Sequence, residues 1–129
     1  MQKEGNSMQI NYVNSVLVNR KVPMEAVIGT NVFVALRIKP IPEYKDGKRT
    51  DNIIGYAYEC VDEIAYKHFT IKIKGQTEPI ISNDELQQLR ENEKVMLEFK
   101  NPMVFMYYNR SALGYEDSYS ADDVMIVSD

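Results

Sequence analysis

The sequence predicts a mainly β protein, a five-stranded Greek-key barrel with one helix between the third and fourth strands. Three observations lead to this fold class. Apolar and polar side chains alternate in several short segments, turn-forming residues separate those segments, and a helix-capping signal follows the third one. A chain of 129 residues is long enough for one such domain with its own core. We expect residues 31–129 to form the barrel domain and residues 1–30 to form an N-terminal arm or an extra strand.

The first two strands are predicted at 31–39 and 52–61. Residues alternate along NVFVALRIK (31–39) as they do in a strand with one buried face. The stretch 39–51 is rich in turn formers and is expected to be a loop, with an Asp-Gly turn at 46–47. Gly55 lies inside the second segment, which indicates a bulge or a sharp bend of the sheet.

The third strand and the helix are predicted from two adjacent patterns. YKHFTIKIKG (66–75) has the most regular alternation in the chain, and GQTEPI (75–80) interrupts it. A helix is expected to begin at Ser82, because Glu85 follows three residues later as in a capping box. The helix should then continue through NDELQQLREN (83–92).

The fourth strand is predicted at 94–99, with an interruption at 101–102 and a continuation at 103–108. A loop is expected at 109–118, and the last strand near 119–127. Three strands, a helix and two further strands are the order of an OB fold. In that fold strands two and three, with the first–second and fourth–fifth loops, form the usual ligand face. The predicted architecture is therefore an OB-fold-like barrel.

Charge is distributed unevenly along the chain. The net charge is −4, yet residues 1–75 hold eleven Lys and Arg against eight Asp and Glu, whereas residues 76–129 hold four against eleven. This segregation can give one face a positive field inside an acidic protein, or the acidic half can be an ordinary solvated surface. No run of apolar residues is long enough to cross a membrane, no signal-peptide pattern is present, and Cys60 stands alone. We expect a cytoplasmic protein with no membrane partner.

The predicted ligand face combines cations with aromatic rings. Cations neutralise phosphates and rings stack bases, which is what single-strand binding requires. Thr70, Tyr108 and Tyr115 lie in the same segments. The candidate nucleic-acid-binding residues are Arg37, Lys39, Tyr44, Lys45, Lys48, Arg49, Tyr56, Tyr58, His68, Lys72, Lys74, Lys100, Tyr107 and Arg110.

Other interpretations of these residues stay open. Tyr56 and Tyr58 share a strand face with Cys60, so both can equally be core residues with hydrogen-bonded hydroxyls. One of Tyr107 and Tyr108 must point inward if their strand is regular. Exposed lysines on a strand are also a common device against edge-to-edge association.

Enzyme chemistry is not expected. One histidine and one cysteine cannot build the usual zinc cluster, and no glycine-rich phosphate loop is present. The adjacent acidic pairs at 116–117 and 122–123 would point to opposite faces of a strand. The sequence therefore predicts no catalytic residue, no metal site and no cofactor.

Three stretches resemble a known family: RTDNIIGYAYE (49–59), VMLEFKNP (95–102) and SADDVMIV (120–127). They are similar to the YdcP/HelP-type proteins of Gram-positive conjugative elements and plasmids. The resemblance implies a helicase processivity factor, an OB-like accessory protein that coats or clamps DNA during replication or transfer. Other OB-type single-strand binders of related plasmids are an alternative family. The implied ligand is single-stranded DNA, with duplex DNA also open, and self-association along the strand is open as well.

The acidic second half of the chain suggests a different function. Exposed acidic pairs favour basic partners. The alternative is therefore a protein-interaction adaptor that docks a helicase, a relaxase or a host replication factor.

Overall fold

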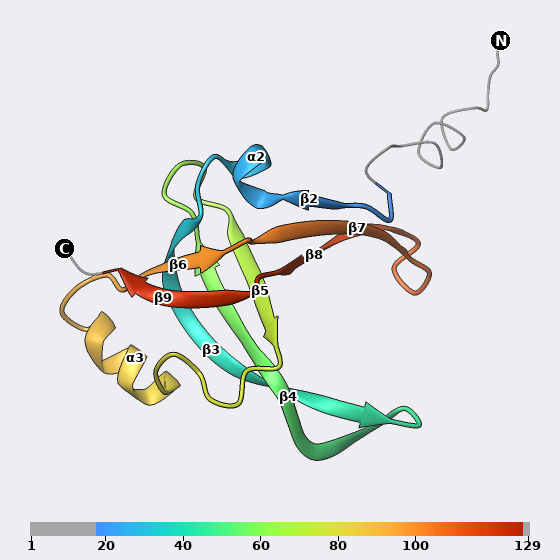
Figure 1. Ribbon diagram of the computed structural model, residues 1–129, viewed down its shortest axis with the longest axis horizontal. Helices are drawn as coiled ribbons and strands as arrows, with labels where there is room; N and C mark the ends of the chain where they lie inside the picture. The colour runs from blue at the N-terminus through green and yellow to red at the C-terminus, as the bar shows by residue number, and fades with distance from the viewer. Residues whose placement is uncertain (1–17, 128–129) are drawn as a thin grey trace, which may run out of the picture.

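The computed structural model describes residues 18–127. One sheet of eight strands curls into an open half-barrel, so the protein is mainly β (Figure 1). The strands are hydrogen-bonded in the order β2-β7-β8-β5-β4-β3-β6-β9. The elements are β2 (Lys21–Pro23), α2 (Met24–Ile28), β3 (Val32–Lys45), β4 (Lys48–Val61), β5 (His68–Lys74), α3 (Asn83–Arg90), β6 (Met96–Lys100), β7 (Met103–Asn109), β8 (Gly114–Ser120) and β9 (Asp123–Val127).

The prediction of five strands is wrong for residues 18–127, which contain eight. The predicted fourth strand is two strands, because Asn101 adopts a left-handed backbone (φ 50°) and Pro102 has no N–H to give to a ladder. β6 pairs with β3 and β9, whereas β7 pairs with β2 and β8. The predicted loop 109–118 is largely strand β8, and β9 begins separately at Asp123.

The position of the helix also differs from the prediction. α3 follows β5, which is the fourth of the eight strands rather than the third of five, and a second helix, α2, precedes β3. The capping signal itself is confirmed: the Ser82 hydroxyl oxygen accepts the backbone N–H of Glu85 at 3.1 Å. None of the helices among residues 18–127 is long and apolar enough to span a membrane.

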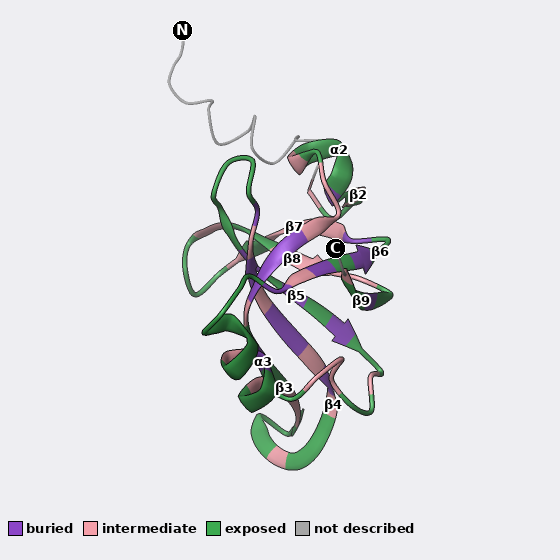
Figure 2. Ribbon diagram, turned by 90° about the vertical axis from the view of Figure 1, so that its left-hand side faces the viewer, coloured by how far each residue is buried: buried purple, intermediate pink, exposed green. Residues whose placement is uncertain are grey.

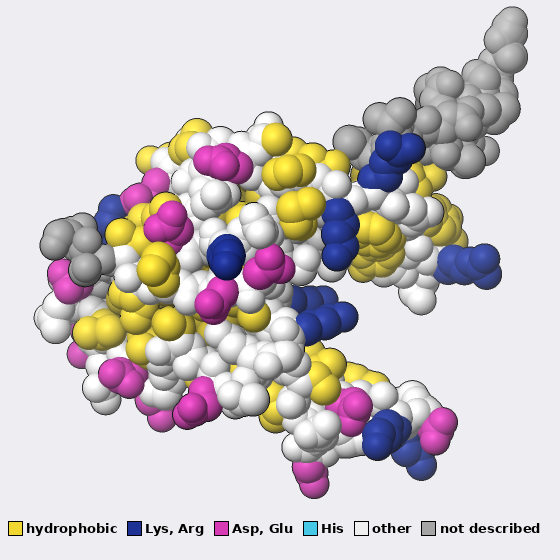
Figure 3. Space-filling view, in the orientation of Figure 1, with side chains coloured by type: hydrophobic (Ala, Val, Ile, Leu, Met, Phe, Trp, Pro, Cys, Tyr) yellow, Lys and Arg dark blue, Asp and Glu magenta, His cyan; other side chains and the backbone are white. Residues whose placement is uncertain are grey.

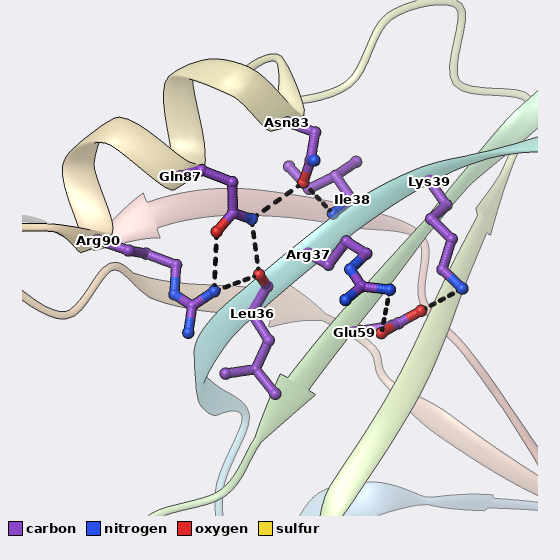
Figure 4. Close-up of polar contacts among 8 residues, drawn as sticks. All are labelled: Leu36, Arg37, Ile38, Lys39, Glu59, Asn83, Gln87 and Arg90. Carbon is purple, nitrogen blue, oxygen red and sulfur yellow. Dashed lines mark hydrogen bonds and ion pairs between the residues drawn. The ribbon is translucent and has the colours of Figure 1, made fainter.

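Side chains of helix α3 form hydrogen bonds with the backbone of β3 where its pairing with β4 is interrupted. The register with β4 shifts between Ala35 and Arg37, and a bulge leaves backbone groups without a strand partner. The Leu36 carbonyl oxygen accepts hydrogen bonds from the side chains of Gln87 (2.9 Å) and Arg90 (2.7 Å), as Figure 4 shows. The Asn83 side-chain oxygen accepts the Ile38 N–H at 3.0 Å. Polar side chains of α3 therefore supply hydrogen bonds to the backbone groups that the bulge leaves without a strand partner.

The β3–β4 hairpin is longer than predicted. Most of the expected loop at 39–51 is strand, and only Asp46 and Gly47 form the turn. Both have positive φ, as a two-residue turn of type I′ requires, so the Asp-Gly turn is confirmed. The hairpin projects from the half-barrel (Figure 1). Gly55 marks a close approach of strands, because a Cβ there would lie 2.3 Å from the backbone oxygen of Ile73.

The core fills the inner face of the curled sheet (Figure 2). Phe33 makes edge-to-face contacts with Phe69 and Phe99, with ring centroids 5.7 and 5.9 Å apart. Met24 of α2 and Leu86 of α3 are fully buried and join this cluster. Because alternate residues of a strand point to opposite faces, the outer side of β3, β4 and β5 is left for polar side chains.

Residues 1–17, part of the segment predicted as an arm or an extra strand, lie outside the described residues. The remainder of that segment contains β2 and α2, and β2 forms one edge of the sheet next to β7.

Candidate nucleic-acid interface

Strands β3, β4 and β5 bring lysines from two predicted segments onto one surface. Ala57 of β4 is paired with Lys39 of β3 on one side and with Lys72 of β5 on the other. Laterally paired residues point to the same face of a sheet, so the two lysines flank a small side chain. Lys74 follows one step along, opposite Gly55. We call this surface the cationic face; its residues are Arg37, Lys39, Ala57, Glu59, His68, Thr70, Lys72 and Lys74.

The cationic face is open to solvent and lies in a hollow. Its two β5 lysines are exposed, and the alternating burial of β5 confirms the predicted two-sided strand. Figure 3 shows the hollow between the β3–β4 and β7–β8 hairpins, with Lys and Arg side chains on its wall. Small residues at positions 55 and 57 keep the floor of the face low between the longer lysines. This is a shape that a flexible polyanion can enter.

Glu59 carries a negative charge inside this face. Its carboxylate lies 2.5 Å from the Lys39 Nζ and 4.0 Å from an Arg37 guanidinium nitrogen, as Figure 4 shows. The Arg37 and Lys39 side chains are 57% and 53% exposed, whereas the Glu59 side chain is 27% exposed. The carboxylate therefore occupies the position toward which both cations point, and a phosphate would have to compete with it.

The tip of the β3–β4 hairpin gathers a second set of predicted residues. Tyr44 pairs with Arg49, and Lys45 pairs with Lys48, beside the Asp-Gly turn. All four side chains are exposed. The tip thus carries three cations and one ring at one end of the hollow.

Tyr56 and Tyr58 belong to the core rather than to the cationic face. Tyr58 is fully buried; its hydroxyl donates to the side-chain oxygen of Gln76 at 2.8 Å and accepts the Ile80 N–H at 3.0 Å. Burial raises the pKa of the Tyr58 phenol above its ordinary value. Tyr56 is partly buried and packs against the same cluster. Of the two interpretations that the sequence left open, the core residue with a satisfied hydroxyl describes Tyr58.

The β7–β8 hairpin separates its tyrosines onto two faces. Tyr107 donates a hydrogen bond to the Glu116 carboxylate at 3.2 Å, and this bond raises the pKa of the Tyr107 phenol. Tyr108 points the other way and meets Tyr115 edge to face, with centroids 5.3 Å apart. Arg110 is exposed in the connecting turn. The hairpin therefore places Tyr107 on one side of the sheet and the Tyr108–Tyr115 pair on the other.

Two predicted residues lie at or beyond the limits of the cationic face. His68 is exposed at the start of β5, opposite Val61. Lys100 is on β6, paired with Asp123, and two strands separate β6 from β5. The structure does not bring Lys100 together with the other candidates.

Sequence reasoning missed two residues beside this surface. Phe105 precedes Tyr107 by two positions on β7, so it shares that face, and Lys21 of β2 is paired with it. The alternation of MVFMYY already places positions 105 and 107 on one side of a strand. Lys21 could not be found in this way because its segment shows no clear strand pattern.

The buried polar groups near the site have structural roles. Asp62 is fully buried and accepts the backbone N–H groups of Ile64, Ala65 and Lys67. Burial alone would raise the pKa of this carboxyl, but the three hydrogen bonds hold it below its ordinary value. Burial, with a smaller effect of Asp62, raises the pKa of the Cys60 thiol to about 12.

Among residues 18–127, no group of three or more His, Cys, Asp or Glu side chains is arranged to hold a metal ion. A concavity of about 190 Å³ lies on the other side of β7, beside α2. Its lining includes Met24, Phe69, Asp117 and Tyr119, and the Tyr119 hydroxyl donates to the Asp117 carboxylate at 3.3 Å.

No protein-family model, no curated protein and no solved structure matches the chain.

Proposed function

We propose that the protein binds single-stranded DNA in a sequence-tolerant way, without catalysis, through the cationic face. The observation that carries the proposal is the row in which Ala57 of β4 lies between exposed Lys39 of β3 and exposed Lys72 of β5. Cations arranged along a groove neutralise consecutive phosphates and release their counterions. Contacts to phosphates carry no sequence information, so tolerance of sequence is expected.

The strand pairing supports an OB-like reading of the half-barrel. β3, β4 and β5 form a meander, β5 pairs in parallel with β8, and β6 pairs with the start of β3. We interpret β6 with β7, and β8 with β9, as two long strands that each bend at a short break. With this interpretation the cationic face lies on the ligand side of an OB fold, and the two hairpin tips flank it as that fold's binding loops do.

The resemblance to YdcP/HelP-type proteins supports a setting for this activity. A protein of this kind would coat or clamp the strand that a helicase releases during replication or transfer of a conjugative element or plasmid. The same setting implies a location in the cytoplasm.

Fluorescence anisotropy with a labelled oligo-dT at low salt tests the proposal. We expect saturable binding that weakens steeply as salt is added. Lys72→Glu/Lys74→Glu should bind much more weakly with a nearly unchanged melting temperature, because both side chains are exposed. Lys100→Glu is the control for charge, since it lies outside the cationic face. Absence of binding at tens of micromolar protein would overturn the proposal.

A second function, docking of a basic protein partner, is favoured by the β9 edge. β9 ends the strand order of the sheet, and Met125 and Ile126 are exposed there at 56% and 39%. Asp122 and Asp123 lie beside them. An exposed apolar edge strand can add a strand from another chain. A Met125→Lys variant that keeps DNA affinity but loses a purified helicase or relaxase would support this function, as would retention of that partner by the wild type after nuclease treatment. Loss of the partner on nuclease treatment would argue against it.

A further inference from the structure

Two aromatic rings are stacked on the outer side of β7. Phe105 and Tyr107 have ring centroids 6.4 Å apart and an interplanar angle of 15°. Both side chains are partly exposed. The Tyr107 hydroxyl donates to Glu116 on β8, and this bond restrains the ring. An ordered pair of exposed rings is a large apolar surface with a low entropic cost of binding.

Strand register places this pair on the same sheet face as the β5 lysines. Lys72 of β5 is paired with Ser120 of β8, and Ser120 is paired with Met103 of β7. Lateral partners share a face, and every second residue along a strand returns to it. Phe105 and Tyr107 are two and four residues beyond Met103, so they continue the surface that Lys72 begins.

A serine and a glutamate of β8 lie on one side of the rings, and the far side carries a cation. Ser118 is paired with Phe105 and exposed Glu116 with Tyr107, whereas β8 pairs with β5 at Tyr119 and Ser120. Two interstrand spacings, about 10 Å, separate Met103 of β7 from Lys72 of β5, and the rings lie two and four residues further along β7. On the other side, exposed Lys21 of β2 is paired with Phe105. Lys21 thus lies on one side of the stacked rings, and Ser118 and the Glu116 carboxylate lie on the other.

We propose that the Phe105–Tyr107 pair is a base-stacking site, on which bases of the bound single strand stack while its phosphates lie on the cationic face and at Lys21. This inference rests on the proposed function and divides the DNA-binding surface into a part that stacks bases and a part that contacts phosphates. The cations of the cationic face together with Lys21 outnumber the Glu59 and Glu116 carboxylates, and this excess favours a polyanion as the occupant. A neutral apolar partner covering the rings would bring uncompensated cations into its interface, whereas a nucleic acid supplies both the ring faces and the neutralising charge.

The test removes the ring faces and keeps apolar side chains. Phe105→Leu/Tyr107→Leu retains much of the apolar volume, and Tyr108→Leu is the matched control on the opposite face of the same strand. Anisotropy is measured with oligo-dT and with an abasic oligonucleotide of equal length. We expect the double variant to lose about 5- to 150-fold in affinity for oligo-dT, the range for one stacked base. It should lose little for the abasic strand.

Salt dependence provides a second readout. Stacking releases no counterions, so the double variant should keep the wild-type slope of affinity against salt, whereas Lys72→Glu should make the slope shallower. A double variant that melts far below the wild type is replaced by Tyr107→Leu alone, for which the same loss restricted to oligo-dT is expected.

The outcomes separate this inference from the function on which it rests. No binding by the wild-type protein would overturn the proposed function itself. Wild-type binding with a double variant equal to Tyr108→Leu would overturn the stacking site alone. Equal losses for both oligonucleotides would overturn it too, since the rings would then support the structure rather than the bases. A changed sedimentation coefficient with unchanged DNA affinity would instead identify a contact between copies of the chain and also overturn it.

Discussion

Glu59→Gln should strengthen binding of single-stranded DNA. The Glu59 carboxylate now holds Lys39 at 2.5 Å and Arg37 at 4.0 Å, in the middle of the cationic face. A phosphate that reaches these cations must displace the carboxylate or share them with it. Glutamine has nearly the same size and shape but no charge, so the substitution leaves both cations available without opening a cavity.

The expected gain follows from the exposure of the two ion pairs. Both cationic side chains are more than half exposed, so each pair is worth about 0.2–1 kcal/mol. Release of two such pairs gives about 0.4–2 kcal/mol, which corresponds to about a 2- to 30-fold tighter complex. If one more phosphate is then neutralised, the slope of log affinity against log salt steepens by about 0.7.

The measurement is an anisotropy titration of oligo-dT at several salt concentrations. Glu98→Gln changes the net charge by the same amount on the outer side of β6, away from the cationic face, and serves as the control. The prediction requires Glu59→Gln to exceed this control in both affinity and salt slope. Equal effects of the two variants would mean that Glu59 acts only through net charge, and weaker binding by Glu59→Gln would refute the competition between carboxylate and phosphate.

Three further predictions concern the buried polar groups. Tyr58→Phe leaves the Ile80 N–H and the Gln76 side chain without their hydrogen-bond partner. The free energy of unfolding should therefore fall by about 1–3 kcal/mol in a denaturant titration, and the affinity for DNA should not change. A loss of affinity would mean that Tyr58 is part of the interface. Asp62 has a folded-state pKa below the ordinary value of 3.8, so its stabilisation is present above that value and is lost as pH falls through the folded-state pKa. Acid melting curves should therefore lose part of their pH dependence in Asp62→Asn, and identical profiles would contradict this origin. Cys60, buried with a thiol pKa of about 12, should react with a thiol reagent at pH 8 only when denaturant is added; rapid reaction without denaturant would contradict its burial.

Local signals in the sequence predicted local structure well. Strict alternation located strand β5, Ser82 with Glu85 located the start of α3, and the Asp-Gly pair located the hairpin turn. Each of these features is decided by neighbours within a few residues. The interruption between β6 and β7 was predicted at 101–102, but the separate pairing of its two halves and the break between β8 and β9 were not. Both depend on which distant strand each half pairs with.

In the candidate site, too, features decided by nearby residues were predicted and features decided by distant strand pairing were not. The exposed face of Lys72 and Lys74 was predicted because it is evident from alternation within one strand. Tyr58 could not be assigned, since alternation defines two faces but does not say which one is inside. Phe105 was missed because its role depends on lateral pairing through β8 to β5, and that register is invisible in a single sequence.

A gel shift with single-stranded and duplex DNA of equal length and sequence tests the central claim most directly. Exposed bases are needed for stacking, and a flexible strand is needed to follow the hollow between the hairpins. The predicted result is retardation of the single strand at protein concentrations that leave the duplex unshifted. Equal or tighter binding of the duplex, or no shift of the single strand at tens of micromolar protein, would contradict the claim that this face binds single-stranded DNA.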